Sequence, residues 1–120
     1  MYPNRESEIR AGIEFYEKAA KQGHLDAMTD LGFLYERGVK SENGNSYFIE
    51  PHPQHALKYY QKASKAGFPR GYNNLGSLYI TCQTLPEDAN GGNILKGINC
   101  LEKAVGMKYP RACFNLGKCH

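Results

Sequence analysis

Apolar and small residues recur along the chain with the spacing of amphipathic helices. One stripe occupies positions 12, 16, 19 and 20 and returns at 56, 60 and 63. A second stripe occupies 27, 28, 31, 34 and 35 and returns at 71, 72, 75, 78 and 79. Steps of three and four residues place such positions on one side of a helix. The pattern predicts an all-α fold of six helices, over residues 6–22, 25–37, 53–66, 69–81, 93–106 and 110–120.

Glycine and proline mark the expected helix ends. Gly23 and Gly67 follow the first and third predicted helices, where a left-handed residue commonly ends a helix. Pro69 and Pro110 stand where the next helices begin, and the fixed φ of proline suits a first helical position. In the third unit Lys108 takes the place of the cap glycine, so this turn lacks the glycine signal of the other two.

A Leu-Gly pair shows that the helices form repeats. It occurs at Leu31-Gly32, Leu75-Gly76 and Leu116-Gly117, at spacings of 44 and 41 residues. We therefore expect an α-solenoid of antiparallel helix pairs in one domain over residues 1–120. Its units are 25–66 and 69–106, flanked by half-units 6–22 and 110–120. Because the end of a solenoid normally needs a polar cap, we expect the chain to be part of a longer array.

Small residues at repeated positions predict close helix contacts. A glycine inside a helix costs about 1 kcal/mol against alanine, so its recurrence implies that a neighbouring helix approaches closely. This argument applies to Gly32, Gly76 and Gly117. Tyrosines are expected to fill the larger gaps, with their hydroxyls on solvent or a backbone carbonyl; they are Tyr16, Tyr35, Tyr60 and Tyr79.

Two connections, residues 38–52 and 82–92, are rich in Gly, Asn, Ser or Pro and are predicted to be loops. The first contains an isolated apolar run, Tyr47-Phe48-Ile49. This run either packs back on the helices or offers an exposed apolar contact to a partner.

Composition and charge exclude some classes of protein. The 120 residues carry a formal charge of +3 with both signs mixed along the chain, whereas nucleic-acid binders usually have clustered Lys and Arg. No apolar run approaches the roughly 18 residues of a membrane span, and the first residues are too polar for a signal peptide. We therefore expect no nucleic-acid partner and no membrane insertion.

The reactive side chains do not form a recognisable catalytic or metal motif. The four cysteines contain no CxxC pair and are interpreted as free thiols of a reducing, cytoplasmic location, with a disulfide or a reactive thiol as the alternative. His52 and His55 form an HxxH pair, which lacks the further ligands that a metal needs. Phosphate-binding loops and nucleophile elbows are also absent from the sequence. We predict no cofactor, no metal and no enzymatic activity.

The repeated motifs resemble the Sel-one-like repeat, a relative of the tetratricopeptide repeat. The second unit carries the resemblance most fully, at Ala56, Tyr59, Tyr60, Lys62, Ala63, Gly67, Gly71, Leu75, Gly76, Leu78 and Tyr79. The first unit matches well and the third more weakly, and the two loops are longer than the short turn of the family. The resemblance implies a right-handed superhelix that serves as a scaffold or adaptor. A secreted branch has a disulfide in each repeat, and Val105 stands where the partner of Cys113 would be, which argues against that branch.

The resemblance also implies which surface would bind a partner. In the related tetratricopeptide fold the helix with the Leu-Gly pair lines the concave face. By position this gives a candidate groove formed by Asp26, Thr29, Phe33, Glu36, Arg70, Asn73, Ser77, Ile80, Arg111, Phe114 and Lys118. Asn and Arg there supply directed donors for a peptide backbone or a carboxylate. The alternative is a solvated face without a ligand.

The function predicted from the sequence is a scaffold or adaptor that binds a protein or peptide on this concave face. The alternative is a non-catalytic regulatory segment of a larger enzyme, such as a kinase or a ubiquitin-ligase component. The two hypotheses differ in whether a catalytic domain flanks these residues.

Overall fold

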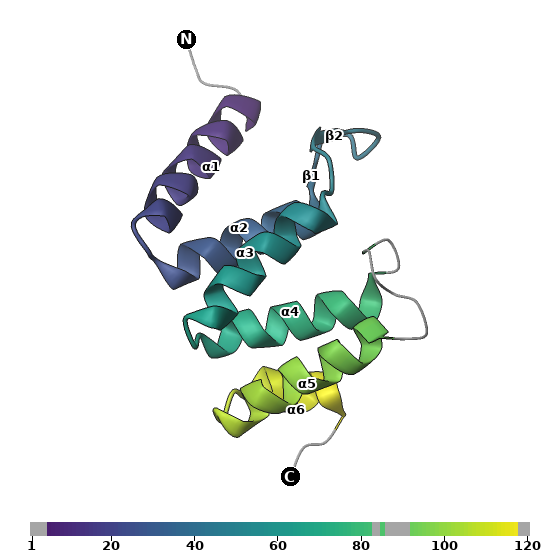
Figure 1. Ribbon diagram of the computed structural model, residues 1–120. Helices are drawn as coiled ribbons and strands as arrows, with labels where there is room; N and C mark the ends of the chain where they lie inside the picture. Colours follow the sequence, from purple (N-terminus) through teal and green to yellow (C-terminus); the bar gives the residue numbers. More distant parts are fainter. Residues whose placement is uncertain (1–4, 83–84, 86–91, 118–120) are drawn as a thin grey trace.

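The computed structural model describes residues 5–82, 85 and 92–117, which form six helices and a short hairpin (Figure 1). The helices are α1 (Arg5–Lys21), α2 (Leu25–Arg37), α3 (Pro53–Lys65), α4 (Pro69–Thr81), α5 (Gly92–Gly106) and α6 (Pro110–Leu116). They stack in sequence order along one direction. The overall dimensions of 52 × 30 × 26 Å are those of an elongated stack, so the all-α solenoid predicted from the repeat is confirmed.

Consecutive helices pack against each other, and the helices that carry the Leu-Gly pair also contact one another. Contacts join α2 to α4 and α4 to α6, whereas those between α1 and α3, or α3 and α5, are sparser. The layer of α2, α4 and α6 is therefore the more closely packed of the two. We call the surface of α2, α4 and α6 the inner face, and that of α1, α3 and α5 the outer face.

The helices end where glycine and proline predicted. Gly23 and Gly67 have φ values of +92° and +83°, and proline stands in the first turn of α3, α4 and α6. Lys108 performs the same turn as the two glycines, with φ at +62°, although a lysine adopts this conformation less readily. The third turn is therefore structurally equivalent to the first two.

Two of the three Leu-Gly glycines make the close contacts that their recurrence predicted. A Cβ on Gly32 would lie 2.4 Å from the Tyr60 ring, and a Cβ on Gly76 would lie 2.7 Å from the carbonyl oxygen of Gly97. The prediction is wrong for Gly117, which ends α6 in a left-handed conformation with φ at +77°. Because no described helix packs on that side of α6, a Cβ there would meet nothing within 4 Å.

The core lies between the helix layers in two clusters. One contains Ala56, Tyr60, Leu75, Leu78 and Leu85, and the other Ile13, Ala20, Ala27 and Leu31. Leu85 belongs to the predicted loop 82–92, yet it is buried in the first cluster. Of that loop only Cys82, Leu85 and Gly92 lie within the described residues. Both clusters share Tyr35 at their edges, which joins them into a continuous interior.

The predicted loop 38–52 contains a hairpin, which corrects the sequence-based expectation. Strands β1 (Val39–Lys40) and β2 (Tyr47–Ile49) pair antiparallel, with Val39 opposite Ile49. Side-chain hydrogen bonds among Ser41, Asn43 and Ser46 close its turn. Strands of two and three residues are too short to show an alternating pattern.

The run Tyr47-Phe48-Ile49 could either pack back on the helices or offer an exposed contact to a partner. The structure shows packing on the helices for one of its three residues. Ile49 packs against the core cluster of α1 and α2. The backbone N–H of His52 donates to the carbonyl oxygen of Tyr35 and so holds the end of the hairpin on α2. Tyr47 remains partly exposed.

Candidate functional site on the inner face

A shallow groove of about 240 Å³ runs across the inner face and is built by three helices. Its lining comes from α2, α4 and α6, the helices with the Leu-Gly pair. The lining residues are Phe33, Glu36, Arg37, Asn73, Asn74, Ser77, Arg111 and Asn115. The groove is therefore formed by consecutive repeats together, and no single repeat contains it.

The structure brings five of the predicted partner-binding residues together in this groove. They are Phe33, Glu36, Asn73, Ser77 and Arg111. Asp26 and Arg70 lie beside it in an ion pair, Ile80 packs near Gly97 on α5, and Phe114 protrudes from α6 without lining the groove. Lys118 lies outside the described residues.

Two of the predicted residues are not outward-facing, which corrects the sequence-based expectation. Thr29 and Asn73 are almost completely buried. The Thr29 hydroxyl donates to the carbonyl oxygen of Leu25 one turn earlier, at 2.6 Å. These positions face the neighbouring helix of the same layer, so their side chains contribute to packing between repeats.

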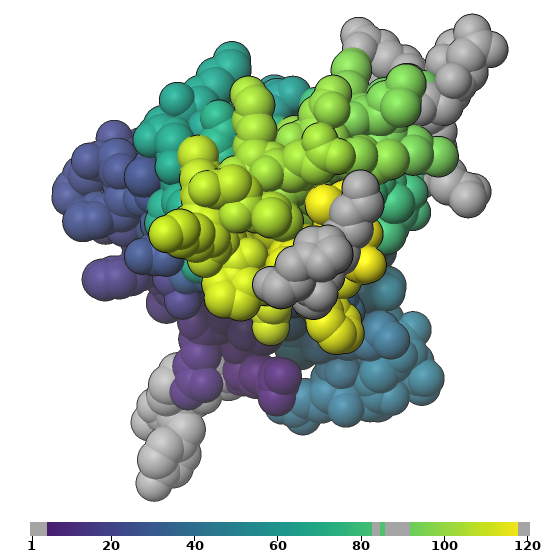
Figure 2. Space-filling model, turned by 90° about the horizontal axis from the view of Figure 1, so that it is seen from below, coloured from purple at the N-terminus to yellow at the C-terminus, as the bar shows by residue number. Residues whose placement is uncertain are grey.

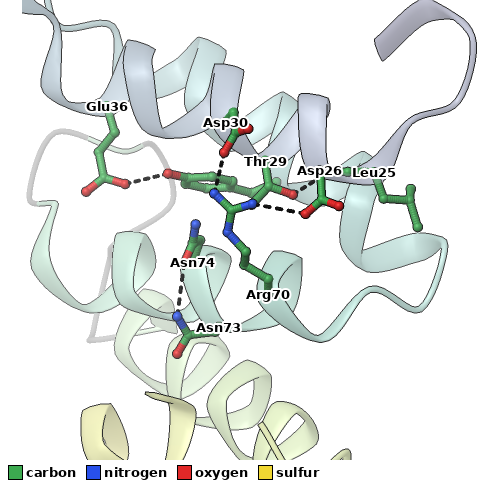
Figure 3. Close-up of polar contacts among 9 residues, drawn as sticks. Leu25, Asp26, Thr29, Asp30, Glu36, Arg70, Asn73 and Asn74 are labelled. Carbon is green, nitrogen blue, oxygen red and sulfur yellow. Dashed lines mark hydrogen bonds and ion pairs between the residues drawn. The ribbon is translucent and has the colours of Figure 1, made fainter. Parts of the chain in front are cut away.

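Arg70 joins α4 to α2 through two carboxylates (Figure 3). Its Nη1 lies 3.2 Å from Asp26 Oδ1, and its Nη2 donates to Asp30. Burial alone would lower the pKa of Arg70, but the hydrogen bond and charge of Asp30, with the charge of Asp26, outweigh burial and raise it. This guanidinium is thus already occupied by protein carboxylates, and it is less available to a ligand than its sequence position suggested.

Glu36 is also held by the protein itself. The Tyr60 hydroxyl donates to Glu36 Oε1 at 2.8 Å, across the interface between α3 and α2 (Figure 3). Burial of the ring and the nearby Glu36 carboxylate raise the pKa of the Tyr60 phenol. The tyrosine therefore reaches a carboxylate, where the sequence predicted solvent or a backbone carbonyl.

Asparagine side chains form the floor of the groove. Asn73 Nδ2 donates to Asn74 Oδ1 at 3.0 Å, and Asn115 Nδ2 donates to Asn73 Oδ1 at 2.9 Å. Asn115 Nδ2 also lies 3.4 Å from Ser77 Oγ. The groove thus has a polar floor whose amides are oriented by one another across α4 and α6.

Sequence reasoning missed Asn74, Asn115 and Arg37. The repeat contained a signal for the first two, because Asp30, Asn74 and Asn115 occupy one register and place a polar residue in every Leu-Gly helix. Arg37 is the last residue of α2 and has no such counterpart.

Two arginines give the groove a positive character. Arg37 lies over the ring of Phe33, 5.2 Å from its centroid, as in a cation–π contact. Arg111 is exposed at the start of α6. Within the described part of the chain, neither guanidinium has a carboxylate at ion-pair distance. Both keep donors for an incoming acceptor.

A larger hollow of about 460 Å³ lies on the other side of the molecule, beside α1 and α3. It is lined by Glu17, Ala20, Lys21, Gly23, Met28, Tyr59 and Lys62. After burial, the Glu17 carboxylate is the main reason why the pKa values of Tyr35 and Tyr59 are raised. Because Glu17 is surrounded by its own lysines and tyrosines, this hollow presents no consistent charge to a ligand.

The described residues contain no cluster of three or more His, Cys, Asp or Glu that could hold a metal ion. His52 and His55 approach each other, with 2.8 Å between their Nδ1 atoms, but they remain a pair. Cys82, Cys100 and Cys113 are not in disulfides, and burial raises the pKa of the Cys100 thiol. None of the described helices is long and apolar enough to span a membrane.

Fold and groove together define a helical-repeat protein whose inner layer is built from Leu-Gly helices. The family model of the Sel1 repeat matches residues 6–24, 25–68 and 110–120. The chain therefore belongs to the Sel1 repeat family, as its motifs indicated. Proteins of this family generally act as protein-interaction modules and are typically non-catalytic scaffolds.

Several solved structures resemble the chain, among them the following two. One is c5321, a protective antigen of uropathogenic Escherichia coli with an SLR fold, at 27% identity and a TM-score of 0.69. The other is a Sel1 repeat protein from Oxalobacter formigenes, at 22% identity and a TM-score of 0.60. Each match covers 88% of this chain, but only 20% of the first structure and 70% of the second. No curated protein sequence matches the chain significantly.

Proposed function

We propose that the chain is a scaffold segment that binds an extended peptide of a partner protein in the inner-face groove. The observation that carries this proposal is the groove itself, in which three repeats combine a polar floor with two arginines that have no ion-pair partner among the described residues. The amides and guanidinium groups suit the carbonyl oxygens of a peptide backbone and acidic side chains. Phe33 adds an apolar surface for one side chain of the peptide.

The shape of the groove supports a peptide better than a small molecule. The groove is shallow and shared by three helices, and the described residues hold no group of three or more His, Cys, Asp or Glu that could bind a metal ion. Ligand pockets for small molecules are usually deeper and enclose most of the ligand. Affinity from many shallow contacts is the expected behaviour of such a surface.

The proposal can be tested with peptides selected from a random library on the immobilised chain. The dissociation constant of a selected peptide is then measured for the wild type and for the pair Arg37→Ala and Arg111→Ala. We expect each substitution to weaken binding about tenfold or more, because a hydrogen bond to a charged group contributes about 1.5–3 kcal/mol.

Lys58→Ala and Lys62→Ala provide a matched control, since these lysines are exposed on α3 at the outer face. They should leave the affinity unchanged. If the arginine variants keep wild-type affinity, or if the lysine variants lose as much, the peptide binds elsewhere and the inner-face proposal is wrong.

A further inference from the structure

The turn between β1 and β2 contains an Asn-Gly pair, Asn43-Gly44, in open surroundings. The hairpin projects from the helix stack, as Figure 2 shows in blue at the lower right. Asn43 and Gly44 are both exposed. Gly44 has φ at +73°, and a Cβ there would meet nothing within 4 Å. No described residue therefore hinders a rearrangement of the backbone at this pair.

The side-chain amide of Asn43 is polarised by two hydrogen bonds. The backbone N–H of Asn45 donates to Asn43 Oδ1 at 2.9 Å, and the Ser41 hydroxyl donates to the same atom at 2.7 Å. Because a backbone N–H can only donate, the atom that it meets is the oxygen of the amide. The Ser46 hydroxyl in turn donates to Ser41 Oγ at 3.0 Å, which strengthens the Ser41 donor. Both bonds to Oδ1 draw electrons away from Asn43 Cγ.

Two donors on one carbonyl oxygen favour attack on its carbon. When a nucleophile adds to an amide, negative charge develops on the oxygen, and donors that are already in place stabilise this charge. The arrangement at Asn43 Oδ1 is that of a small oxyanion hole. The nucleophile next to it in the chain is the backbone nitrogen of Gly44, which closes a succinimide ring when it attacks Asn43 Cγ.

From this geometry we propose that Asn43 is a site of spontaneous deamidation. The Gly44 nitrogen loses its proton and bonds to Asn43 Cγ. The bond from Cγ to Nδ2 then breaks, and Nδ2 takes up a proton and leaves as ammonia. Water adds to one of the two carbonyls of the succinimide and opens the ring to aspartate or isoaspartate. The inference does not depend on the proposed peptide groove.

The Gly44 nitrogen must first leave the acceptor that it has in the turn. Its N–H donates to the carbonyl oxygen of Ser41 at 3.0 Å. An exposed hydrogen bond of this kind opens at little cost in free energy, and glycine has no side chain that would obstruct the attack. Both donors to Asn43 Oδ1 come from within two residues of Asn43, so the opening does not need to separate them from it.

Deamidation changes the hairpin in charge and in backbone length. A carboxylate replaces a neutral amide, which lowers the formal net charge of +3 by one. Isoaspartate also adds a methylene to the backbone, inside a turn that the Ser41 N–H closes by donating to the Ser46 carbonyl at 2.9 Å. The product is therefore separable from the original chain by ion exchange.

Incubation of the whole chain in mildly alkaline buffer, followed by digestion with trypsin, tests the proposal. Cleavage after Lys40 and Lys58 places Asn43 in the peptide 41–58, apart from a second Asn-Gly pair at 90–91, which lies outside the described residues. Mass spectrometry and labelling with an isoaspartyl methyltransferase measure the product. We expect isoaspartate to accumulate at residue 43. An intact asparagine there, under conditions in which the synthetic peptide 41–58 deamidates, would overturn the proposal.

Ser41→Ala tests the role of the hydroxyl. It should slow deamidation at residue 43 by about two- to tenfold, the factor that one hydrogen bond contributes. Asn45→Gln is the matched control, because it changes the other exposed asparagine of the turn and keeps the backbone N–H that donates to Asn43. This variant should react at the wild-type rate.

Concentrated urea separates the hydrogen bond from a change in local sequence. The wild type and Ser41→Ala should react at the same rate in urea, where the turn is unfolded. Equal rates of the two in the folded state would show that Ser41 does not promote the reaction. The same conclusion would follow if the difference between them persisted in urea.

Discussion

At the scale of single residues, the glycines of the Leu-Gly pairs determine how closely the helices approach. Gly32→Ala places a methyl group against the Tyr60 ring, which is buried and anchored to Glu36 and therefore cannot move aside. We expect a loss of about 1–3 kcal/mol in the free energy of unfolding, measured with urea. Gly12→Ala is the control, because nothing lies within 4 Å of its new methyl group. It should gain up to about 1 kcal/mol from helix propensity. Equal stability of both variants would contradict the close contact.

A second property at the scale of residues is the pH dependence of stability, to which the Tyr60 hydroxyl contributes. Burial first, and then the Glu36 carboxylate, raise the pKa of this phenol above its usual 10.0. Above about pH 10 the unfolded chain loses the proton while the folded chain keeps it, so stability falls as pH rises. Below about pH 10 the contribution of Tyr60 to the free energy of unfolding is fully present.

Tyr60→Phe should therefore flatten the alkaline part of the stability curve. The slope should decrease by up to about 1.4 kcal/mol per pH unit, which corresponds to one proton. At neutral pH the variant should lose about 1.5–3 kcal/mol, because the charged hydrogen-bond partner is left unpaired. Urea unfolding at several values of pH between 7 and roughly 11 measures both effects, since the range brackets the usual pKa of tyrosine. An unchanged alkaline slope would show that Tyr60 does not titrate in this way.

At the scale of elements, the turn between α5 and α6 has the geometry of its two counterparts with a less suitable residue. Lys108 has φ at +62° where Gly23 and Gly67 stand in the other turns. A side chain in this conformation costs about 1 kcal/mol. Lys108→Gly should therefore stabilise the chain by up to about 1 kcal/mol in urea unfolding, and Lys108→Val should destabilise it, because a β-branched residue adopts this conformation least readily. If the order of the two variants is reversed, the turn does not have this conformation in solution.

The helices could be predicted from the sequence because their signals are local and repeated. The observed α2 and α4 begin and end at the predicted residues, α3 and α5 differ by one residue at one end, and α1 differs by one residue at both ends. The hairpin could not be predicted, because its strands are too short for a pattern and their pairing depends on contact with α2. The early end of α6 also escaped prediction, since Gly32 and Gly76 in the same register lie inside their helices whereas Gly117 ends α6 in a left-handed conformation.

The candidate site, like the fold, could be predicted from the sequence only in part. Repeat register placed Phe33, Ser77 and Arg111 together on the inner face, where the structure has a groove. It could not reveal that Arg70 and Glu36 are held by Asp30 and Tyr60, because those partners come from neighbouring helices and their identities do not repeat. Long-range pairs of this kind become visible only when the helices are stacked.

At the scale of the whole molecule, the stack has two kinds of surface with different roles. The inner face combines three repeats into one groove, whereas the hollow beside α1 and α3 is lined by side chains of both charges. The location of the chain in a reducing compartment stays a prediction.

The central claim, that the inner face binds the partner, is tested most directly by mapping a selected peptide on the chain by amide chemical shifts. We predict that the amides of Phe33, Ser77 and Arg111 shift on binding, while those of Lys58 and Lys62 on α3 do not. Shifts confined to α3 and α5 would contradict the claim and place the binding surface on the outer face.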